Sequence, residues 1–304
     1  MPRRFVAACG AFLAALVLVI VSWQRVRLAA QARYVGTPAH QSTPTVSLRA
    51  LRAGSAVLEN AQDKAQREVV CWGDSMTEGT GADVAVIHTE DTEYDASYKS
   101  YPQVLQDLCG LPVFNCGVMG ATSEEIVAMS EGDPLDDEGR PYAVFDQRIA
   151  KLGAKHPGDV LVLEMGSNGG WDNDYEVLIS QYWRIIHHAG CESFIIVGDT
   201  DDPGTSIGDE RQEAFDEGDR LRETDWEAAL REEFGDHFLN MRLYLIENGL
   251  GLCGLEEDAD DEAWASYGCI SEKLRADWTH LNSYGYYAKA RGIYERGVAL
   301  GYWT

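Results

Sequence analysis

Two short runs of this chain are apolar at nearly every position, and they restrict the possible folds more than any other feature. They are DVLVLEMG, from Asp159 to Gly166, and SFIIVGD, from Ser193 to Asp199. A strand with one wet face alternates apolar and polar residues, whereas a strand covered on both faces is apolar throughout. We therefore expect both runs to be strands that are buried on both faces.

Strand and helix signals alternate along the chain from Arg67 onward. The other strand candidates are EVVCW (68–72), PVFNCG (112–117) and HFLNMRLYL (237–245). Helical spacing of apolar residues is clearest from Tyr175 to Ile186, and Gly190 is a stop signal. Further helix candidates cover residues 98–108, 144–152, 226–234 and 282–300, the last of which opens with a capping Asn. The alternation predicts one α/β domain with a mostly parallel sheet.

Polar and glycine-rich segments lie where the predicted strands end, and this edge of a parallel sheet is where sites form. Gly73-Asp74-Ser75 follows the first strand, and NCGVMGATS (115–123) ends the second and continues beyond it. GSNGGW (166–171) follows the third strand, and DWTHLN (277–282) precedes the last helix. Together these segments provide the groups that acyl transfer requires.

A nucleophilic serine needs a base and a group that orients the base. Ser75 is the candidate nucleophile, and His280 is the candidate base that takes its proton during attack. Asp277 can hydrogen-bond one ring nitrogen of His280 while the other ring nitrogen faces Ser75. Asp277 can instead cap its own turn. Asp74 is expected to hold the turn after the first strand.

The tetrahedral intermediate of acyl transfer carries a negative charge on the former carbonyl oxygen, which needs preorganised N–H donors. The candidate donors are the backbone N–H groups of Ser75 and Gly120 and the side-chain amide of Asn168. Gly117 is an alternative to Gly120. A glycine at this place lets the backbone approach the substrate closely.

Ser75, Gly120, Asn168 and His280, taken with their neighbours, resemble the four blocks of the SGNH/GDSL hydrolase family. Gly-Asp-Ser matches the first block, Asn115 followed by Gly120 matches the second, and Asp-x-x-His matches the fourth. The third block is usually Gly-x-Asn-Asp, whereas this chain has Gly166-Ser167-Asn168-Gly169, without the final Asp. The resemblance covers residues 69 to about 300.

The resemblance implies a flavodoxin-like three-layer α/β/α sandwich with a mostly parallel five-stranded sheet, over residues 67–304. It also implies a serine esterase, lipase or related hydrolase that needs no cofactor or metal. The expected substrate is a small-molecule or polymer-borne ester, such as a short acyl or acetyl ester of a carbohydrate or cell-envelope component. The alternatives are a lipase or lysophospholipase, an acyltransferase, or a non-catalytic surface binding module.

Three further sequence features lie outside the four motif blocks or next to them. GTSIG (204–208) matches the Gly-x-Ser-x-Gly pattern, but polar residues separate Ser206 from the preceding strand. EEDADDE (256–262) is expected to be a solvated acidic loop at the rim of the site that disfavours anionic substrates. Trp72, Trp171 and Trp278 each adjoin a motif and are candidates for core packing or for an acyl or sugar pocket.

The N-terminal segment FVAACGAFLAALVLVIVSW (5–23) has 19 residues without a charge, about the length of a membrane-spanning helix. We expect a single-pass anchor, with residues 1–4 in the cytoplasm and residues 24–66 as a stalk. A signal peptide cleaved near Ala30-Gln31-Ala32 is the alternative. Both interpretations place the body of the chain outside the cytoplasm, anchored to the membrane or secreted.

The cysteine content agrees with such a location, and the charge makes one class of partner unlikely. An even set of six cysteines beyond Cys9 suggests disulfides, with Cys109–Cys116 and Cys253–Cys269 as the local pairs. Cys71 and Cys191 remain and can equally be buried thiols. The formal net charge of −25 makes nucleic acid an unlikely partner, because phosphate backbones are repelled.

Overall fold

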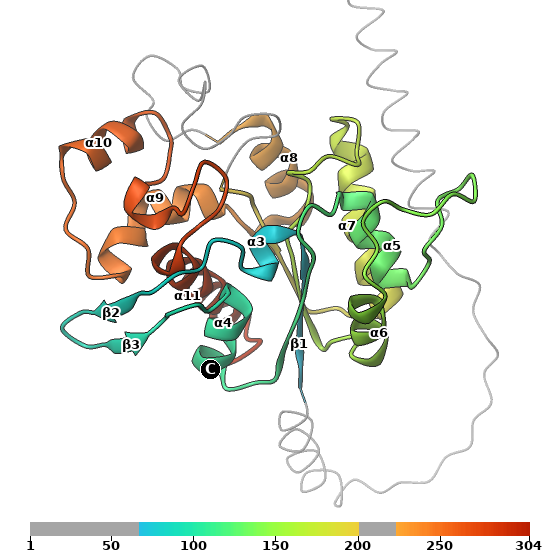
Figure 1. Ribbon diagram of the computed structural model, residues 1–304, viewed down its shortest axis with the longest axis horizontal. Coiled ribbons are helices and arrows are strands. Elements are labelled where there is room, and N and C mark those ends of the chain that lie inside the picture. The colour runs from blue at the N-terminus through green and yellow to red at the C-terminus, as the bar shows by residue number, and fades with distance from the viewer. Residues whose placement is uncertain (1–66, 201–222) are drawn as a thin grey trace, which may run out of the picture. The chain divides into compact units, whose positions relative to one another are not determined.

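The computed structural model describes residues 67–200 and 223–304 (Figure 1), and its centre is a five-stranded parallel sheet. The strand order is β4-β1-β5-β6-β7. The strands are β1 (Val69–Gly73), β4 (Val113–Gly117), β5 (Val160–Leu163), β6 (Phe194–Val197) and β7 (Phe238–Leu239). If only these strands are counted, the order is 2-1-3-4-5, which is the flavodoxin-like arrangement. The predicted fold class is confirmed.

The two apolar runs form the buried strands β5 and β6, and every residue of both strands is buried. Side chains of neighbouring residues in β1 enter different cores: Val69 and Cys71 join one hydrophobic cluster, and Val70 and Trp72 join the other. This alternation follows from the two-residue period of a strand. The sheet is therefore covered on both faces, as the sequence predicts.

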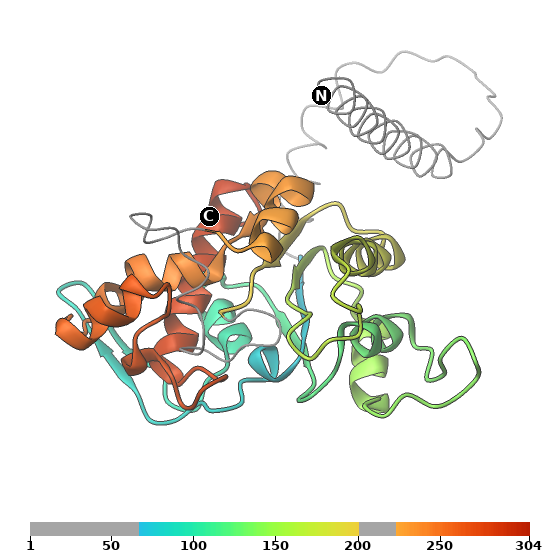
Figure 2. The same ribbon diagram turned by 90° about the horizontal axis from the view of Figure 1, so that it is seen from above.

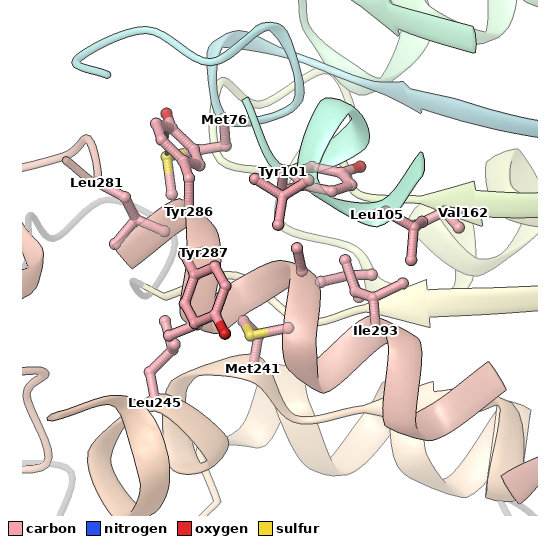
Figure 3. Packing of buried hydrophobic residues seen from close by; sticks show 14 of the residues in the cluster. Met76, Tyr101, Leu105, Val162, Met241, Leu245, Leu281, Tyr286, Tyr287 and Ile293 are labelled. Carbon is pink, nitrogen blue, oxygen red and sulfur yellow. Dashed lines mark hydrogen bonds between the residues drawn. The ribbon is translucent and has the colours of Figure 1, made fainter. Parts of the chain in front are cut away.

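Two groups of helices cover the two faces of the sheet (Figures 1 and 2). Helices α4 (Tyr101–Cys109), α9 (Met241–Leu252) and α11 (Ser283–Ala299) supply the first cluster. Helices α5 (Ser123–Glu131), α6 (Gln147–Lys155), α7 (Tyr175–Ala189) and α8 (Asp225–Phe234) supply the second. In Figure 3 the aromatic side chains of Tyr286 and Tyr287, from α11, lie among apolar side chains of other elements.

Helix boundaries follow capping residues that the sequence marks. Helix α7 ends at Gly190, whose φ of 64° allows it to close the last turn, as predicted. Helix α11 begins after Asn282, whose side-chain oxygen accepts the N–H of Gly285 at 3.0 Å. Both predicted helix ends are confirmed.

Two segments differ from the expectation. The predicted strand at residues 237–245 is only two residues long, because the side chain of Asn240 accepts the N–H of Leu243 and starts helix α9. The acidic segment is not a loop throughout: Asp258 caps helix α10 (Ala259–Ser266). A short hairpin of β2 (Val86–His88) and β3 (Glu93–Asp95) was not predicted.

The predicted disulfides are wrong, since no disulfide joins any of the six described cysteines. Cys116 lies in the cluster on one face of the sheet, whereas Cys109 packs against the cluster on the other face. The sheet therefore separates the two thiols. Cys253 and Cys269 share one cluster, but the thiol of Cys253 donates to the carbonyl oxygen of Tyr284 at 3.2 Å.

The anchor predicted at residues 5–23, the stalk at residues 24–66 and Ser206 fall outside the described residues. Within residues 67–200 and 223–304, no helix combines the length and apolarity that crossing a membrane requires.

Candidate active site

Ser75 lies where strand β1 turns into the short helix α3 (Ser75–Glu78), at the C-terminal edge of the sheet (Figure 1). Asp74 caps this helix, and its Oδ1 accepts the N–H of Met76 at 2.9 Å. Ser75 is only 7% exposed. The tight turn fixes the position of the Ser75 hydroxyl group, and Asp74 has the structural role that the sequence predicts.

His280 reaches Ser75 from a loop that is 205 residues away in sequence, with 3.1 Å between its Nε2 and Ser75 Oγ. Nδ1 of the same ring lies 2.9 Å from Asp277 Oδ2 and 3.1 Å from Asp277 Oδ1. The loop is a tight hairpin between the 3₁₀ helix η3 (Glu272–Leu274) and α11, closed by a bridge between Arg275 and Leu281. The three predicted catalytic side chains therefore form one continuous chain of contacts.

Asp277 both orients the ring and shapes its own loop. Its Oδ1 accepts the backbone N–H of Thr279 at 2.8 Å and that of His280 at 2.7 Å. Partial burial raises the pKa of the Asp277 carboxyl, but the hydrogen bonds from the backbone and ring of His280 outweigh it and hold the pKa below its usual value. The carboxylate therefore stays charged beside the imidazole at neutral pH. Both roles that the sequence left open are present in the structure.

Gly120 and Gly117 differ in a way that bears on the oxyanion site. Gly120 has a φ of 77°, which favours glycine, and no atom lies within 4 Å of the place a Cβ would occupy. The N–H of Gly117 donates to Asn115 Oδ1 at 2.9 Å. A Cβ on Gly117 would lie 2.1 Å from the backbone nitrogen of Glu78. Gly117 thus allows the close approach of β4 to α3, while Gly120 borders open space.

Asn168 follows strand β5, next to Asp74. Its Nδ2 donates to Asp74 Oδ2 and to the carbonyl oxygen of Ala121, each at 3.1 Å. Gly169, which replaces the usual Asp of the third block, has a φ of 77°, and its carbonyl oxygen accepts the backbone N–H and the hydroxyl of Ser123 at 2.9 and 3.0 Å. The Asn168 loop is therefore tied to α5 through its backbone.

Asn115 has a positioning role that the motif alone did not reveal. Its Nδ2 donates to the carbonyl oxygens of Thr77 and Glu78 at 2.9 and 3.3 Å, and to Ser100 Oγ at 3.2 Å. These carbonyl groups belong to the end of α3, the helix that begins with Ser75. Asn115 therefore holds the nucleophile helix against the neighbouring strand.

A buried charged group lies beneath the site and was missed by the sequence analysis. Lys289 of α11 is fully buried and forms an ion pair with Glu164, the residue after strand β5. Asp74 and Asp199 are buried in the same region, and the charges of Asp199 and Glu164 raise the pKa of the Asp74 carboxyl. The available signal was Lys289 itself, which shares the apolar face of α11 with Tyr286 and Ile293 at positions i−3 and i+4.

The ionisation of Asp74 makes the stability of the protein depend on pH. Burial raises the pKa of the Asp74 carboxyl to about 8, and the charges of Glu164 and Asp199 add to the rise, while the N–H of Met76 and the charge of Lys289 oppose it. The unfolded chain releases this proton near pH 4, so between these values the folded state binds more protons than the unfolded state. Stability must therefore fall as the pH rises toward 8.

We expect the free energy of unfolding to drop between pH 5.5 and 8.5, with roughly 2–3 kcal/mol of the drop due to Asp74. Urea denaturation of the wild type and of Asp74→Asn at both pH values measures this contribution. The variant should lose less stability than the wild type over this interval, because its amide does not titrate. An equal loss in both proteins would show that Asp74 does not hold its proton in the folded state.

The tryptophans next to the motifs have different surroundings. Trp72 and Trp171 are buried, and the indole N–H of Trp171 donates to the carbonyl oxygen of Gly166 at 2.8 Å. Both pack in the core. Trp278, in the hairpin that carries His280, is 56% exposed. Only this one of the three is available to a substrate.

The acidic segment is partly neutralised by one lysine. Nζ of Lys273 lies 2.8 Å from Asp258 Oδ2 and 2.6 Å from Asp261 Oδ2. The same two carboxylates accept backbone N–H groups at the start of α10, so they also cap this helix. Other acidic residues of the segment are exposed, namely Glu256, Glu257, Asp260 and Glu262. No group of three or more His, Cys, Asp or Glu within the described ranges is arranged to hold a metal ion.

Comparison with known proteins gives matches of two kinds. No curated protein matches the sequence. Among solved structures, the chain is similar to a member of the lipolytic protein G-D-S-L family from Veillonella parvula, at 15% identity and a TM-score of 0.43, covering 75% of this chain and 96% of that one. It is also similar to a carbohydrate esterase family 2 enzyme from Corynascus thermopiles, at 13% identity and a TM-score of 0.44, covering 85% of this chain and 69% of that one.

A third similar structure is the periplasmic domain of a lipopolysaccharide acetyltransferase from Salmonella Paratyphi A, at 12% identity and a TM-score of 0.41, covering 84% of this chain and 90% of that one.

A family model matches the sequence itself over residues 71–288, a span that begins before Ser75 and ends after His280. This span takes in most of the described fold and each of the motif segments discussed above. On this evidence the chain belongs to the GDSL-like lipase/acylhydrolase family.

Proposed function

We propose that this protein is a serine esterase that cleaves short acyl esters outside the cytoplasm. The observation that supports the proposal best is the contact chain from Ser75 Oγ through the His280 ring to the Asp277 carboxylate, with 3.1 and 2.9 Å between the facing atoms. These distances suit proton transfer in both directions. These three side chains lie at the C-terminal edge of the sheet, beside β1, where the strand order reverses. This is where α/β sheets bind ligands.

In the first half of the reaction, Ser75 Oγ bonds to the carbonyl carbon of the ester while its proton passes to His280 Nε2. The negative charge of Asp277 stabilises the imidazolium that forms. The tetrahedral intermediate then collapses: the bond between the carbonyl carbon and the alcohol oxygen breaks, and His280 Nε2 gives its proton to that oxygen. The alcohol leaves, and the acyl group stays bound to Ser75.

In the second half, water takes the place of the alcohol. His280 Nε2 accepts a proton from the water as its oxygen bonds to the acyl carbon. The bond to Ser75 Oγ then breaks, and Oγ regains the proton from His280. The products are the carboxylic acid and the free enzyme, so the proton balance closes without a cofactor.

The negative oxygen of each intermediate would be held by the N–H groups of Ser75 and Gly120 and by Asn168. Both hydrogens of the Asn168 amide already have acceptors, namely Asp74 and the carbonyl oxygen of Ala121. A charged oxygen is a stronger acceptor than a neutral carbonyl group, so the intermediate would draw the amide hydrogen from Ala121. Asp74 would meanwhile keep the amide in place.

The proposed location rests on the uncharged N-terminal run of 19 residues, which suits a membrane anchor or a signal peptide. A domain held at the outer surface of a membrane meets esters of the cell envelope, including those of its carbohydrates. The high negative charge of the chain disfavours anionic substrates. Short acyl esters of a carbohydrate or another envelope component therefore fit the proposal best.

Reaction with a fluorophosphonate probe tests the proposal directly. The probe should label the folded full-length protein, and mass spectrometry should locate the label on the peptide that contains Ser75. The same preparation should hydrolyse p-nitrophenyl acetate, and heat-denatured protein should do neither. A label on Ser206 instead, or folded protein that neither reacts with the probe nor hydrolyses the ester, would contradict the proposal.

A further inference from the structure

Trp278 is a large aromatic side chain that the fold leaves exposed beside the catalytic groups. It lies between Asp277 and the His280 base, and it is 56% exposed, whereas the other motif tryptophans are buried. Exposure of a side chain of this size beside a site leaves an apolar surface that a ligand can cover, and covering it is favourable. Its position therefore suggests contact with a ligand.

The Trp278 ring is exposed, but a cation–π contact and the closed hairpin restrain it. The guanidinium group of Arg275 lies 5.8 Å from the Trp278 ring centre and 4.5 Å from that of Trp264, which belongs to α10. The Arg275 side chain is only 5% exposed, so these cation–π contacts are shielded from water. The bridge between Arg275 and Leu281 closes the hairpin around Trp278. A ring that is held in advance loses little conformational entropy when a ligand packs against it.

Trp278 lies on the side of Ser75 where the alcohol part of the ester would bind, a conclusion that rests on the proposed function. In that reaction His280 Nε2 protonates the leaving alcohol oxygen, so the alcohol part must lie on the His280 side of Ser75. Trp278 is two residues from His280, which places their Cα atoms at most about 7 Å apart. The acyl part instead adjoins the oxyanion donors, among them Gly120 and Asn168. Trp278 can therefore contact the alcohol part while the carbonyl group faces the donors.

The charge of the segment that carries Trp264 indicates which alcohol fits. Exposed carboxylates of residues 256–262 lie on α10 and the segment before it, the same part of the chain that supplies Trp264. These charges repel an anionic lipid surface or headgroup. A sugar ring is neutral, and its C–H face can pack on an aromatic ring while its hydroxyl groups remain in water. We infer that Trp278 is a stacking platform for the neutral sugar ring of an acylated carbohydrate, whose ester bond is presented to Ser75.

The test compares esters that share the acetyl group and differ in the alcohol. The substrates are monoacetylated methyl glycosides of glucose, galactose and xylose, and ethyl acetate, with acetate release followed in a pH-stat. Trp278→Ala should raise KM for at least one glycoside about tenfold, change kcat less than twofold, and leave kcat/KM for ethyl acetate unchanged. Trp278→Phe should keep KM for the glycosides close to the wild-type value, because it retains an aromatic ring. Tyr267→Ala, which removes another exposed aromatic ring near the end of α10, should have no effect.

Binding measured without turnover separates this inference from the proposed reaction. Calorimetric titration of the intact acetylated glycosides into Ser75→Ala should give a Kd about tenfold lower than titration into Ser75→Ala/Trp278→Ala. If the wild type hydrolyses none of the esters but this difference is found, the proposed reaction fails and the platform stands. Unchanged Kd and KM for all three glycosides would overturn the platform. An equal loss on ethyl acetate would overturn it too, because Trp278 would then serve only the catalytic loop.

Discussion

Exchange of Ser75 for alanine is expected to lower kcat for p-nitrophenyl acetate by about 10⁴-fold or more, down to the background of spontaneous hydrolysis. His280→Ala should have a similar effect. Without the hydroxyl there is no acyl-enzyme, and without the imidazole the hydroxyl keeps its proton and remains a weak nucleophile. The measurement is initial rate at saturating ester, with circular dichroism to show that each variant is folded.

The double variant separates a catalytic unit from two independent effects. Ser75 Oγ and His280 Nε2 are in contact at 3.1 Å and act in one step, so Ser75→Ala/His280→Ala should be no slower than either single variant. Ser206→Ala, in the competing Gly-x-Ser-x-Gly segment, is the matched control and should keep full activity. A Ser75→Ala protein that retains activity, or losses that multiply in the double variant, would refute the assignment of the pair.

The juxtaposition of the candidate site residues could be predicted from sequence because a parallel sheet brings the ends of its strands to one edge. Ser75 follows β1 and Asn168 follows β5, and these strands are hydrogen-bonded neighbours. Ser75 and His280 are 205 residues apart in sequence, so their contact cannot be expected from proximity along the chain. The order of the motifs and the topology of the sheet predict it instead. The predicted placement of these residues at one edge depends only on which residue follows which strand, and the structure has this placement.

Two other predictions from sequence failed, because they depend on side-chain direction and on local hydrogen bonds in three dimensions. Cys109 and Cys116 are close in sequence, but the end of α4 and strand β4 direct them to different cores. Residues 237–245 are apolar enough for a strand, but one local hydrogen bond at Asn240 starts a helix instead. In each case a short-range pattern was overruled by packing or by a cap that composition does not reveal.

The buried pair of Lys289 and Glu164 is expected to have the largest effect on stability. Lys289→Met should lower the free energy of unfolding by about 3–5 kcal/mol, because it leaves the Glu164 carboxylate buried without its counter-charge. Glu164→Gln should cost a similar amount by leaving the ammonium group unpaired. Burial raises the pKa of the Glu164 carboxyl and Lys289 opposes that rise, so removal of the lysine also favours uptake of a proton.

Urea denaturation at pH 8.5, above the Glu164 pKa of about 7, gives these values. Lys151→Met is the matched control, since Lys151 is exposed on α6 and its exchange should change the free energy of unfolding by less than about 0.5 kcal/mol. The double variant Lys289→Met/Glu164→Leu removes both charges together and should lie within about 1–2 kcal/mol of the wild type. If the double variant instead loses the sum of the two single losses, the residues act independently and the ion pair has no stabilising role.

The pair also connects the two halves of the candidate site. Glu164 comes four residues before Asn168, and Lys289 lies on the helix that follows the His280 loop. We expect the buried contact between them to set the distance between the oxyanion side and the base side of Ser75. Because a misplacement of about 1 Å can cost about 100-fold in rate, Lys289→Met should reduce kcat even at temperatures where it remains folded. The double variant, which regains stability without the ion pair, should regain kcat only if the spacing of the site is also restored. Activity therefore reports on the spacing, whereas the free energy of unfolding reports only on the loss of a buried charge.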